Sequence, residues 1–178
     1  MTSSIFNKQI ENRNYLSSVG FKFNLSKYPK IDFLSNSARI PELSLALATQ
    51  PTYLKDIDIP GEKLTYGDFT LKFLVDENME NYMAVYNWLT GLGFPETPAQ
   101  FRDLTTDSAA MRDPKEAFCD GTLRILNSNL REIAKVKFQD LFPVSLTSLD
   151  FDATTSDIQY FTAEASFRYT IYSLTSSL

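Results

Sequence analysis

Residues 158–173 read IQYFTAEASFRYTIYS and decide the fold class. Apolar and polar side chains alternate along this stretch. The apolar row consists of Phe161, Ala163, Ala165, Phe167, Tyr169 and Ile171, and the polar row consists of Thr162, Glu164, Ser166, Arg168 and Thr170. A period of two residues is typical of a β-strand with one buried face. The stretch therefore predicts one long strand, 158–173, in a mainly β protein.

Six other stretches carry strand patterns. They lie at 21–25, 31–40, 64–75, 122–126, 133–139 and 146–151. Pro29 and Lys30 separate the first two by so short a turn that we expect a hairpin. Short connections between neighbouring strands favour antiparallel sheets. The predicted fold class is mainly β (α+β): an antiparallel β-sandwich or barrel of about seven or eight strands with one flanking α-helix.

The flanking helix is predicted from about Asn78 to Leu92. Asp76 or Asn78 can cap its start by accepting backbone N–H bonds, and Gly91 and Gly93 favour its end. The residues expected to form a buried stripe recur at helical spacing: Met79, Tyr82, Met83, Tyr86 and Leu89. A stripe of this kind indicates packing against the outside of the barrel rather than a cofactor site.

Three segments interrupt the strand pattern of what we expect to be one domain, residues 1–178. Residues 1–18 are predicted to be an N-terminal arm, 42–63 an assembly loop and 94–120 a variable loop. The start of the second segment, LSLALA, can form an extended strand. The contact residues expected in this segment are Leu43, Leu45, Leu47, Tyr53, Asp56, Ile57 and Asp58. Large apolar groups on a long loop indicate an interface, so we expect the loop to join subunits or rings.

Formal charge is distributed unevenly along the chain. Residues 1–40 carry six basic and two acidic residues, a net of +4, and residues 41–80 carry three basic and eight acidic residues, a net of −5. A basic N-terminal segment followed by an acidic assembly loop suits identical copies that pack head to tail, although ordinary surface variation gives the same pattern. The total of −5 argues against a protein that grips nucleic acid by neutralising phosphates.

The composition also removes several kinds of chemistry. The chain has no histidine, which excludes Ser-His-Asp and Cys-His mechanisms and His-ligated metals. Its single cysteine, Cys119, is expected to be a small half-buried side chain. Carboxylate pairs occur at Asp56/Asp58, Asp76/Glu77 and Asp150/Asp152. Helix-start charge and solvation explain such neighbours, so we expect no catalytic residue, no cofactor, no metal and no enzyme.

No membrane or secretion signal is evident. No apolar run approaches the roughly 20 residues of a membrane span. The start, MTSSIFNKQIENRNYL, lacks the apolar core of a signal peptide. We therefore expect no membrane anchor and a protein that is made in a reducing cytosol or in something assembled there.

The order of these stretches resembles the tail tube protein of contractile-tailed phages of the T-even type. The stretches that carry the resemblance are FKFNL at 21–25, ARIP at 38–41, DIPGEK at 58–63, YGDFTL at 66–71, DEN at 76–78, DLFP at 140–143 and LDFD at 149–152, before the long last strand. The resemblance covers roughly residues 20–93 and 121–173. Residues 94–120 depart from the family pattern.

The resemblance implies the tail-tube fold and a structural protein. Members of that family form hexameric rings that stack into a hollow tube, the conduit through which DNA reaches the host cell. The implied partners are further copies, the tail sheath protein, the baseplate hub or initiator and the tape measure protein in the lumen, with DNA passing but not specifically bound. The implied place is the virion tail, assembled in the host cytoplasm. A baseplate tube initiator and a secretion-system tube ring of the same fold remain alternatives.

A lumen surface is predicted on the polar row of the last strand and on the polar face of the first hairpin. The candidate lumen residues are Thr162, Glu164, Ser166 and Thr170. Small polar side chains suit this place because a basic lumen would hold phosphates and slow the passage of DNA. Arg168 and Lys22 are the cations on these faces, and we expect carboxylates to pair with them.

Overall fold

The computed structural model describes residues 15–27, 35–93, 96, 97, 99, 117–152, 154 and 160–176. These ranges contain nine strands and one helix. The strands are β1 (Phe21–Leu25), β2 (Ser35–Arg39), β3 (Leu43–Gln50), β4 (Ile57–Tyr66), β5 (Phe69–Leu74), β6 (Cys119–Leu126), β7 (Glu132–Leu146), β8 (Thr162–Arg168) and β9 (Ile171–Ser176). The helix α1 spans Glu80–Gly93. Every strand pair is antiparallel, so the predicted mainly β fold with one helix is confirmed.

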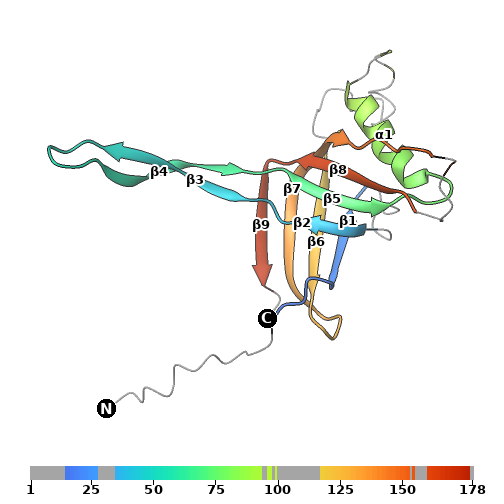
Figure 1. Ribbon diagram of the computed structural model, residues 1–178, viewed down its shortest axis with the longest axis horizontal. Coiled ribbons are helices and arrows are strands. Elements are labelled where there is room, and N and C mark those ends of the chain that lie inside the picture. Colours follow the sequence, from blue (N-terminus) through green and yellow to red (C-terminus); the bar gives the residue numbers. More distant parts are fainter. Residues whose placement is uncertain are drawn as a thin grey trace, which may run out of the picture.

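Seven strands form one connected sheet that folds back on itself at β7. The first half of β7 lies between β6 and β9, and its second half pairs with β8. This gives two layers, the β9 layer (β1-β6-β7-β9) and the β5 layer (β7-β8-β5-β2). Figure 1 shows strands of the β9 layer running down the page and strands of the β5 layer running across it. The sheet is not a closed barrel, because β1 and β2 stand at the two ends of the strand order.

A bulge at Asp140 allows β7 to change layers. Asp140 has a φ of 54°, in the left-handed region that residues other than glycine rarely adopt. Opposite it the register shifts, because Cys119 pairs with Leu141 and Gly121 pairs with Phe138. Extra residues in one strand bend it and increase its twist. The first half of β7 therefore ends its pairing with β9 at Gln139, and its second half pairs with β8 from Phe142 onward.

Aromatic side chains fill the space between the two layers. The ring centroid of Phe69 lies 5.0 Å from that of Phe23, 4.6 Å from that of Phe138 and 6.1 Å from that of Phe167. All four rings are almost completely buried. Phe69 stands on β5 and Phe138 on β7, so this cluster joins the β5 layer to the β9 layer.

Helix α1 begins after a tight turn that follows β5. The Oδ1 atom of Asp76 accepts a 2.8 Å hydrogen bond from the N–H of Glu80, which confirms Asp76 as a capping residue. Asn81 is 1% exposed, and its Nδ2 atom donates to the carbonyl of Leu74. The Nε1 atom of Trp88 donates to the carbonyl of Ala117 at 2.9 Å. These bonds tie the start of the helix to the end of β5 and its second half to the segment just before β6.

The predicted helix stripe is wrong in phase. The fully buried helix residues are Asn81, Val85, Trp88 and Gly91. Met83 and Tyr86 are half exposed, Tyr82 and Leu89 pack partly against the core, and Met79 precedes the helix in a positive-φ turn. The expected stripe took Met79 as the first helical contact. In the structure Met79 has a positive φ and lies in the turn before the helix. The buried row of the helix therefore begins at Asn81.

Three strand predictions are also wrong. The first two predicted strands do not form a hairpin, since β1 pairs with β6 and β2 pairs with β5. The strand expected at 146–151 is absent, because β7 ends at Leu146 and residues 147–152 contain no strand. The long last strand is divided at Tyr169 and Thr170 into β8 and β9, which belong to different layers. Local alternation predicts a strand but carries no information about its partner.

Two predicted segments fall mainly outside the described residues. Of the N-terminal arm at 1–18, the structure describes only residues 15–18, which are exposed. Of the variable loop at 94–120, it describes residues 96, 97, 99 and 117–120, and β6 begins at Cys119. The remaining residues of both segments stay predictions.

The aromatic cluster gives a first testable prediction. Phe69→Ala should lower the free energy of unfolding by about 3–5 kcal/mol, because it leaves a cavity among Phe23, Phe138 and Phe167. Denaturant unfolding of the dilute chain measures this loss. The matched change Met83→Ala, on the exposed side of α1, should stay within about 0.5 kcal/mol of the unaltered chain. Equal losses in the two variants would contradict the core described here.

Candidate assembly surfaces

The segment predicted as an assembly loop is a long β-hairpin. Strands β3 and β4 pair with each other, from Leu43 opposite Tyr66 to Gln50 opposite Ile57. They form a separate two-stranded sheet. Figure 1 shows this hairpin projecting far from the two layers. The extended strand expected in LSLALA is confirmed, and Ile57 to Lys63, expected as part of a loop, lie in β4.

Both faces of the β3–β4 hairpin expose apolar side chains. By strand alternation, the four leucines of β3 and β4 share one face, and the two isoleucines of β4 lie on the other. The exposed residues are Leu43, Leu45, Leu47, Ile57, Ile59 and Leu64, with Tyr53 and Leu54 at the tip. An isolated two-stranded hairpin is marginally stable in water. Exposed apolar surface of this extent marks an interface.

A bulge in β4 sets the register of the hairpin. Leu45 pairs with Leu64 and Leu47 pairs with Pro60, so β4 carries extra residues at this point. Gly61 sits in the bulge, where a Cβ atom would lie only 2.5 Å from the carbonyl oxygen of Ala46. Glycine is therefore required for the two backbones to approach each other here. The Pro-Gly pair, which suggested a loop in the sequence, is a bulge within a strand.

Tyrosine side chains hold the base of the hairpin to the body. The hydroxyl of Tyr169 donates a 2.8 Å hydrogen bond to the carbonyl of Gly67, and the hydroxyl of Tyr172 lies 3.5 Å from the carbonyl of Pro41. Gly67 and Pro41 flank the two legs of the hairpin. Tyr66 stacks edge-on against both tyrosines, with ring centroids 6.1 and 5.6 Å away. We call Tyr66, Tyr169 and Tyr172 the tyrosine clamp.

The tyrosine clamp also reaches the core. Phe138 lies 5.1 Å from Tyr169 and 6.0 Å from Tyr172 between ring centroids. Partial burial, together with the nearby Tyr172, Asp68 and Tyr66, raises the pKa of Tyr169 to about 12. The direction follows because burial and neighbouring negative charge both disfavour tyrosinate. Tyr169 is therefore neutral over the whole physiological pH range and keeps its hydrogen bond to the carbonyl of Gly67.

The second candidate surface is the outer face of the β5 layer. Thr162, Glu164 and Ser166 alternate on β8 with the buried Ala163, Ala165 and Phe167. Beside them on β5, Thr70 stands opposite Ser166 and Lys72 stands opposite Glu164. Thr170 does not extend this row, because it lies in the bend after β8 and its N–H bonds to the carbonyl of Gln139.

Charges on this face are largely paired. The Nζ atom of Lys72 lies 3.1 Å from Glu164, and the Nε atom of Arg168 lies 3.0 Å from Asp68. The carboxylate expected beside Arg168 is thus confirmed. Arg39 on β2 adds a further cation, at the register position of Thr70. Lys22 belongs to β1 in the other layer, since the hairpin expected to bring it here does not form.

The acidic side chains and the cysteine of the described residues are the remaining candidates for chemistry. No group of three or more Cys, Asp or Glu side chains among them is arranged to hold a metal. Cys119 is buried, more deeply than the half-buried position that we expected. Asp152 accepts two hydrogen bonds from Thr154, which lower the pKa of its carboxyl. Within the described ranges, no helix has both the length and the apolarity for crossing a membrane.

Sequence reasoning missed the tyrosine clamp and Asn81. Tyr66 falls within the strand predicted at 64–75, and Tyr169 falls in the apolar row of the predicted last strand. The available signal was Tyr-Thr-Ile-Tyr at 169–172, where two tyrosines flank the bend between β8 and β9. Asn81 was overlooked because a buried polar residue interrupts an apolar stripe, although its amide is fully hydrogen-bonded.

Comparison with protein families gives one match over nearly the whole chain. Residues 1–175 match a family described as phage tail tube protein. A comparison with curated proteins found no match.

Solved structures with the same fold come from contractile injection systems. The chain is similar to a chain in the anti-feeding prophage cap, a tube terminating cap, with a TM-score of 0.68, 15% identity and coverage of 98% of this chain and 100% of that one. It is also similar to a chain in the sheath–tube complex of the extracellular contractile injection system PVC, with a TM-score of 0.64, 15% identity and coverage of 98% and 99%. A chain of the anti-feeding prophage baseplate gives a TM-score of 0.59, 13% identity and coverage of 87% and 90%. At these identities the likeness concerns the fold.

The tyrosine clamp gives a prediction about pH. An unfolded tyrosine releases its proton near pH 10.0, whereas Tyr169 in the folded chain releases it near 12. The stability that depends on neutral Tyr169 is therefore present below pH 10.0 and is lost as the pH rises towards 12. Tyr169→Phe should make the fall in unfolding free energy over this range shallower. It should also cost about 1 kcal/mol at neutral pH through the lost hydrogen bond.

Denaturant unfolding at several pH values measures both effects. Tyr15→Phe is the matched control, because Tyr15 is fully exposed and should change neither. Identical pH profiles for the Tyr169 variant and the unaltered chain would show that the clamp hydroxyl is not protected from ionisation.

Proposed function

The chain belongs to the family of phage tail tube proteins, and on that basis we propose that it is the repeating subunit of the tube in a contractile tail. The family match over residues 1–175 carries this proposal. Fold similarity to a chain of a sheath–tube complex supports the contractile setting. The subunit is then a structural component of the virion tail and not an enzyme.

The tube is proposed to consist of hexameric rings stacked on one another and assembled in the host cytoplasm. Its partners are then further copies, the tail sheath protein, the baseplate hub or initiator, the tape measure protein and DNA in transit. The exposed apolar hairpin supports self-assembly, because an isolated chain leaves this surface in water. The positions of β1 and β2 at the two ends of the strand order support it further, since sheet edges are commonly covered by neighbouring strands.

The outer face of the β5 layer is proposed to line the lumen. Its centre consists of small polar groups and two ion pairs, Lys72–Glu164 and Arg168–Asp68. With these charges paired, Arg39 is the further cation of this face, so the net field that could hold phosphates is small and DNA passes without a strong salt-dependent grip. The outer face of the β9 layer then points away from the lumen, because the two layers lie back to back across the core.

The hairpin provides the test of assembly. In one variant, residues 46–63 are replaced by Asn-Gly, which keeps the pair Leu45–Leu64 next to a two-residue turn. This chain should fold but form no tubes, because it lacks most of the exposed apolar hairpin. Electron microscopy of the purified chain measures assembly, and circular dichroism with thermal unfolding measures folding.

Leu130→Asn serves as the control. It removes another exposed apolar side chain, in the turn between β6 and β7, and should form tubes normally. Tubes from the shortened chain would contradict the role of the hairpin. Isolated rings from the unaltered chain would instead favour a baseplate initiator or a secretion-system ring.

The lumen assignment has its own test. Thr162→Cys places a thiol on the outer face of the β5 layer, and Lys137→Cys places one on the outer face of the β9 layer. In assembled tubes, the first thiol should react with a small maleimide but not with a maleimide coupled to a folded protein, which cannot enter the lumen. The second should react with both reagents. The opposite pattern would place the β9 layer inside.

A further inference from the structure

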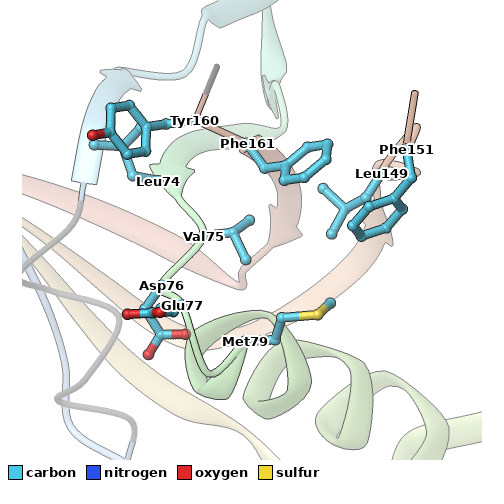
Figure 2. A pocket seen from close by; sticks show the side chains of 9 residues that line it. All are labelled: Leu74, Val75, Asp76, Glu77, Met79, Leu149, Phe151, Tyr160 and Phe161. Carbon is cyan, nitrogen blue, oxygen red and sulfur yellow. The ribbon is translucent and has the colours of Figure 1, made fainter. Parts of the chain in front are cut away.

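An apolar pocket lies at the end of β5 that is remote from the hairpin. Its volume is about 730 Å³. The apolar groups that line it include Leu74, Met79, Leu149, Phe151, Tyr160 and Phe161. Figure 2 shows Val75, Met79, Leu149, Phe151 and Phe161 arranged round one open space. The volume is typical of sites that receive ligand-sized groups.

Aromatic groups at the pocket are open to solvent. Phe151 is 73% exposed and Tyr160 is 81% exposed. The ring of Phe151 packs on that of Phe161 with centroids 4.7 Å apart, which keeps one wall in place. An exposed cluster of this kind is typical of a docking surface.

The hairpin tip carries two apolar side chains that could enter such a pocket. Tyr53 and Leu54 are almost fully exposed there. The turn is closed by Thr52, whose hydroxyl donates to the carbonyl of Lys55 and accepts a 3.4 Å hydrogen bond from its N–H. These hydrogen bonds restrict the backbone of the turn that carries Tyr53 and Leu54. Less backbone entropy is therefore lost when the tip binds.

Tip and pocket lie at opposite ends of the same strand. The hairpin enters β5 through Gly67 and Asp68 at the Phe69 end, and the pocket begins at Leu74, where β5 finishes. Figure 1 shows the tip at one extreme of the molecule and the end of β5 beside α1 on the opposite side. One chain therefore cannot fill its own pocket. A copy placed further along this axis brings its tip towards the pocket, in the head-to-tail geometry that generates rings or filaments.

Charge favours the same pairing. Lys55 is the only cation between Leu43 and Glu62, and it directly follows Leu54. Asp76 and Glu77 line the pocket beside the start of α1. Opposite charges at a rim guide the encounter and fix the register more than they add affinity.

We propose that the pocket of one subunit receives Tyr53 and Leu54 of the hairpin tip of a neighbouring copy, with Lys55 beside Asp76 and Glu77. This contact rests on the proposed function, because it specifies how copies join in the tube. It assigns the acceptor site for the hairpin.

Disulfide trapping tests the contact directly. The full chain carrying Leu54→Cys and Phe151→Cys is assembled and then oxidised. A disulfide requires Cα atoms within about 7 Å, so a link forms only if tip and pocket meet. We expect a ladder of covalent oligomers on a non-reducing gel. The matched control combines Leu54→Cys with Val19→Cys, an equally accessible site before β1, and should give no ladder. Cys119 is buried and stays in both chains.

Electron microscopy of the same samples separates the two proposals. Particles without a ladder contradict the pocket contact and leave the tube proposal intact. A ladder without particles supports the contact and contradicts the tube. Absence of both contradicts both proposals.

A charge exchange adds a second readout. Lys55→Glu should lower the yield of assembled particles, and Glu77→Lys in the same chain should restore it in part. Equal loss in the single and double variants would show that another surface receives Lys55. A tip variant, Leu54→Asp, that assembles normally would show that the pocket has a different occupant.

Discussion

Strand β7 pairs with strands of both layers, and the rest of the structure depends on how it passes from one layer to the other. Its first half bonds to β6 and β9, and its second half bonds to β8. Phe138 stands just before the bulge that separates the halves. Its ring packs on Phe69 in the core and on Tyr169 in the tyrosine clamp. One buried side chain thus connects the interior to the base of the hairpin, so the projecting element is anchored to the buried core.

The division between buried and exposed apolar groups follows this arrangement. Apolar side chains between the layers are buried within the chain itself, whereas those of the hairpin and several of those at the pocket are exposed in the isolated chain. A protein that worked alone would gain nothing from exposed leucines along a projecting ribbon. In an assembly the same groups become interior, and the cost of exposing them is confined to the free subunit.

Sequence patterns predicted the parts that depend on local periodicity. The alternation at 21–25 gave β1 correctly, and Asp76 was recognised as a helix cap. Partners and breaks were missed where tertiary contacts decide them. The alternating row of the sequence runs from Phe161 to Ile171 across the break, so periodicity alone does not separate β8 from β9. Met79 has helical spacing in the sequence, although its φ is 56°. The polar row on β8 was identified, but the two strands expected beside it proved to belong to different layers.

The direct passage from β4 through Gly67 and Asp68 into β5 has a mechanical consequence. A pull on the hairpin tip is transmitted along the axis of β5, which is bonded to β2 on one side and to β8 on the other. Hydrogen bonds between antiparallel strands run across that axis. A force along the strand therefore loads the six residue pairs from Phe69–Phe167 to Leu74–Thr162 together, in shear, instead of peeling them one after another. The subunit therefore resists tension that is applied through the β3–β4 hairpin.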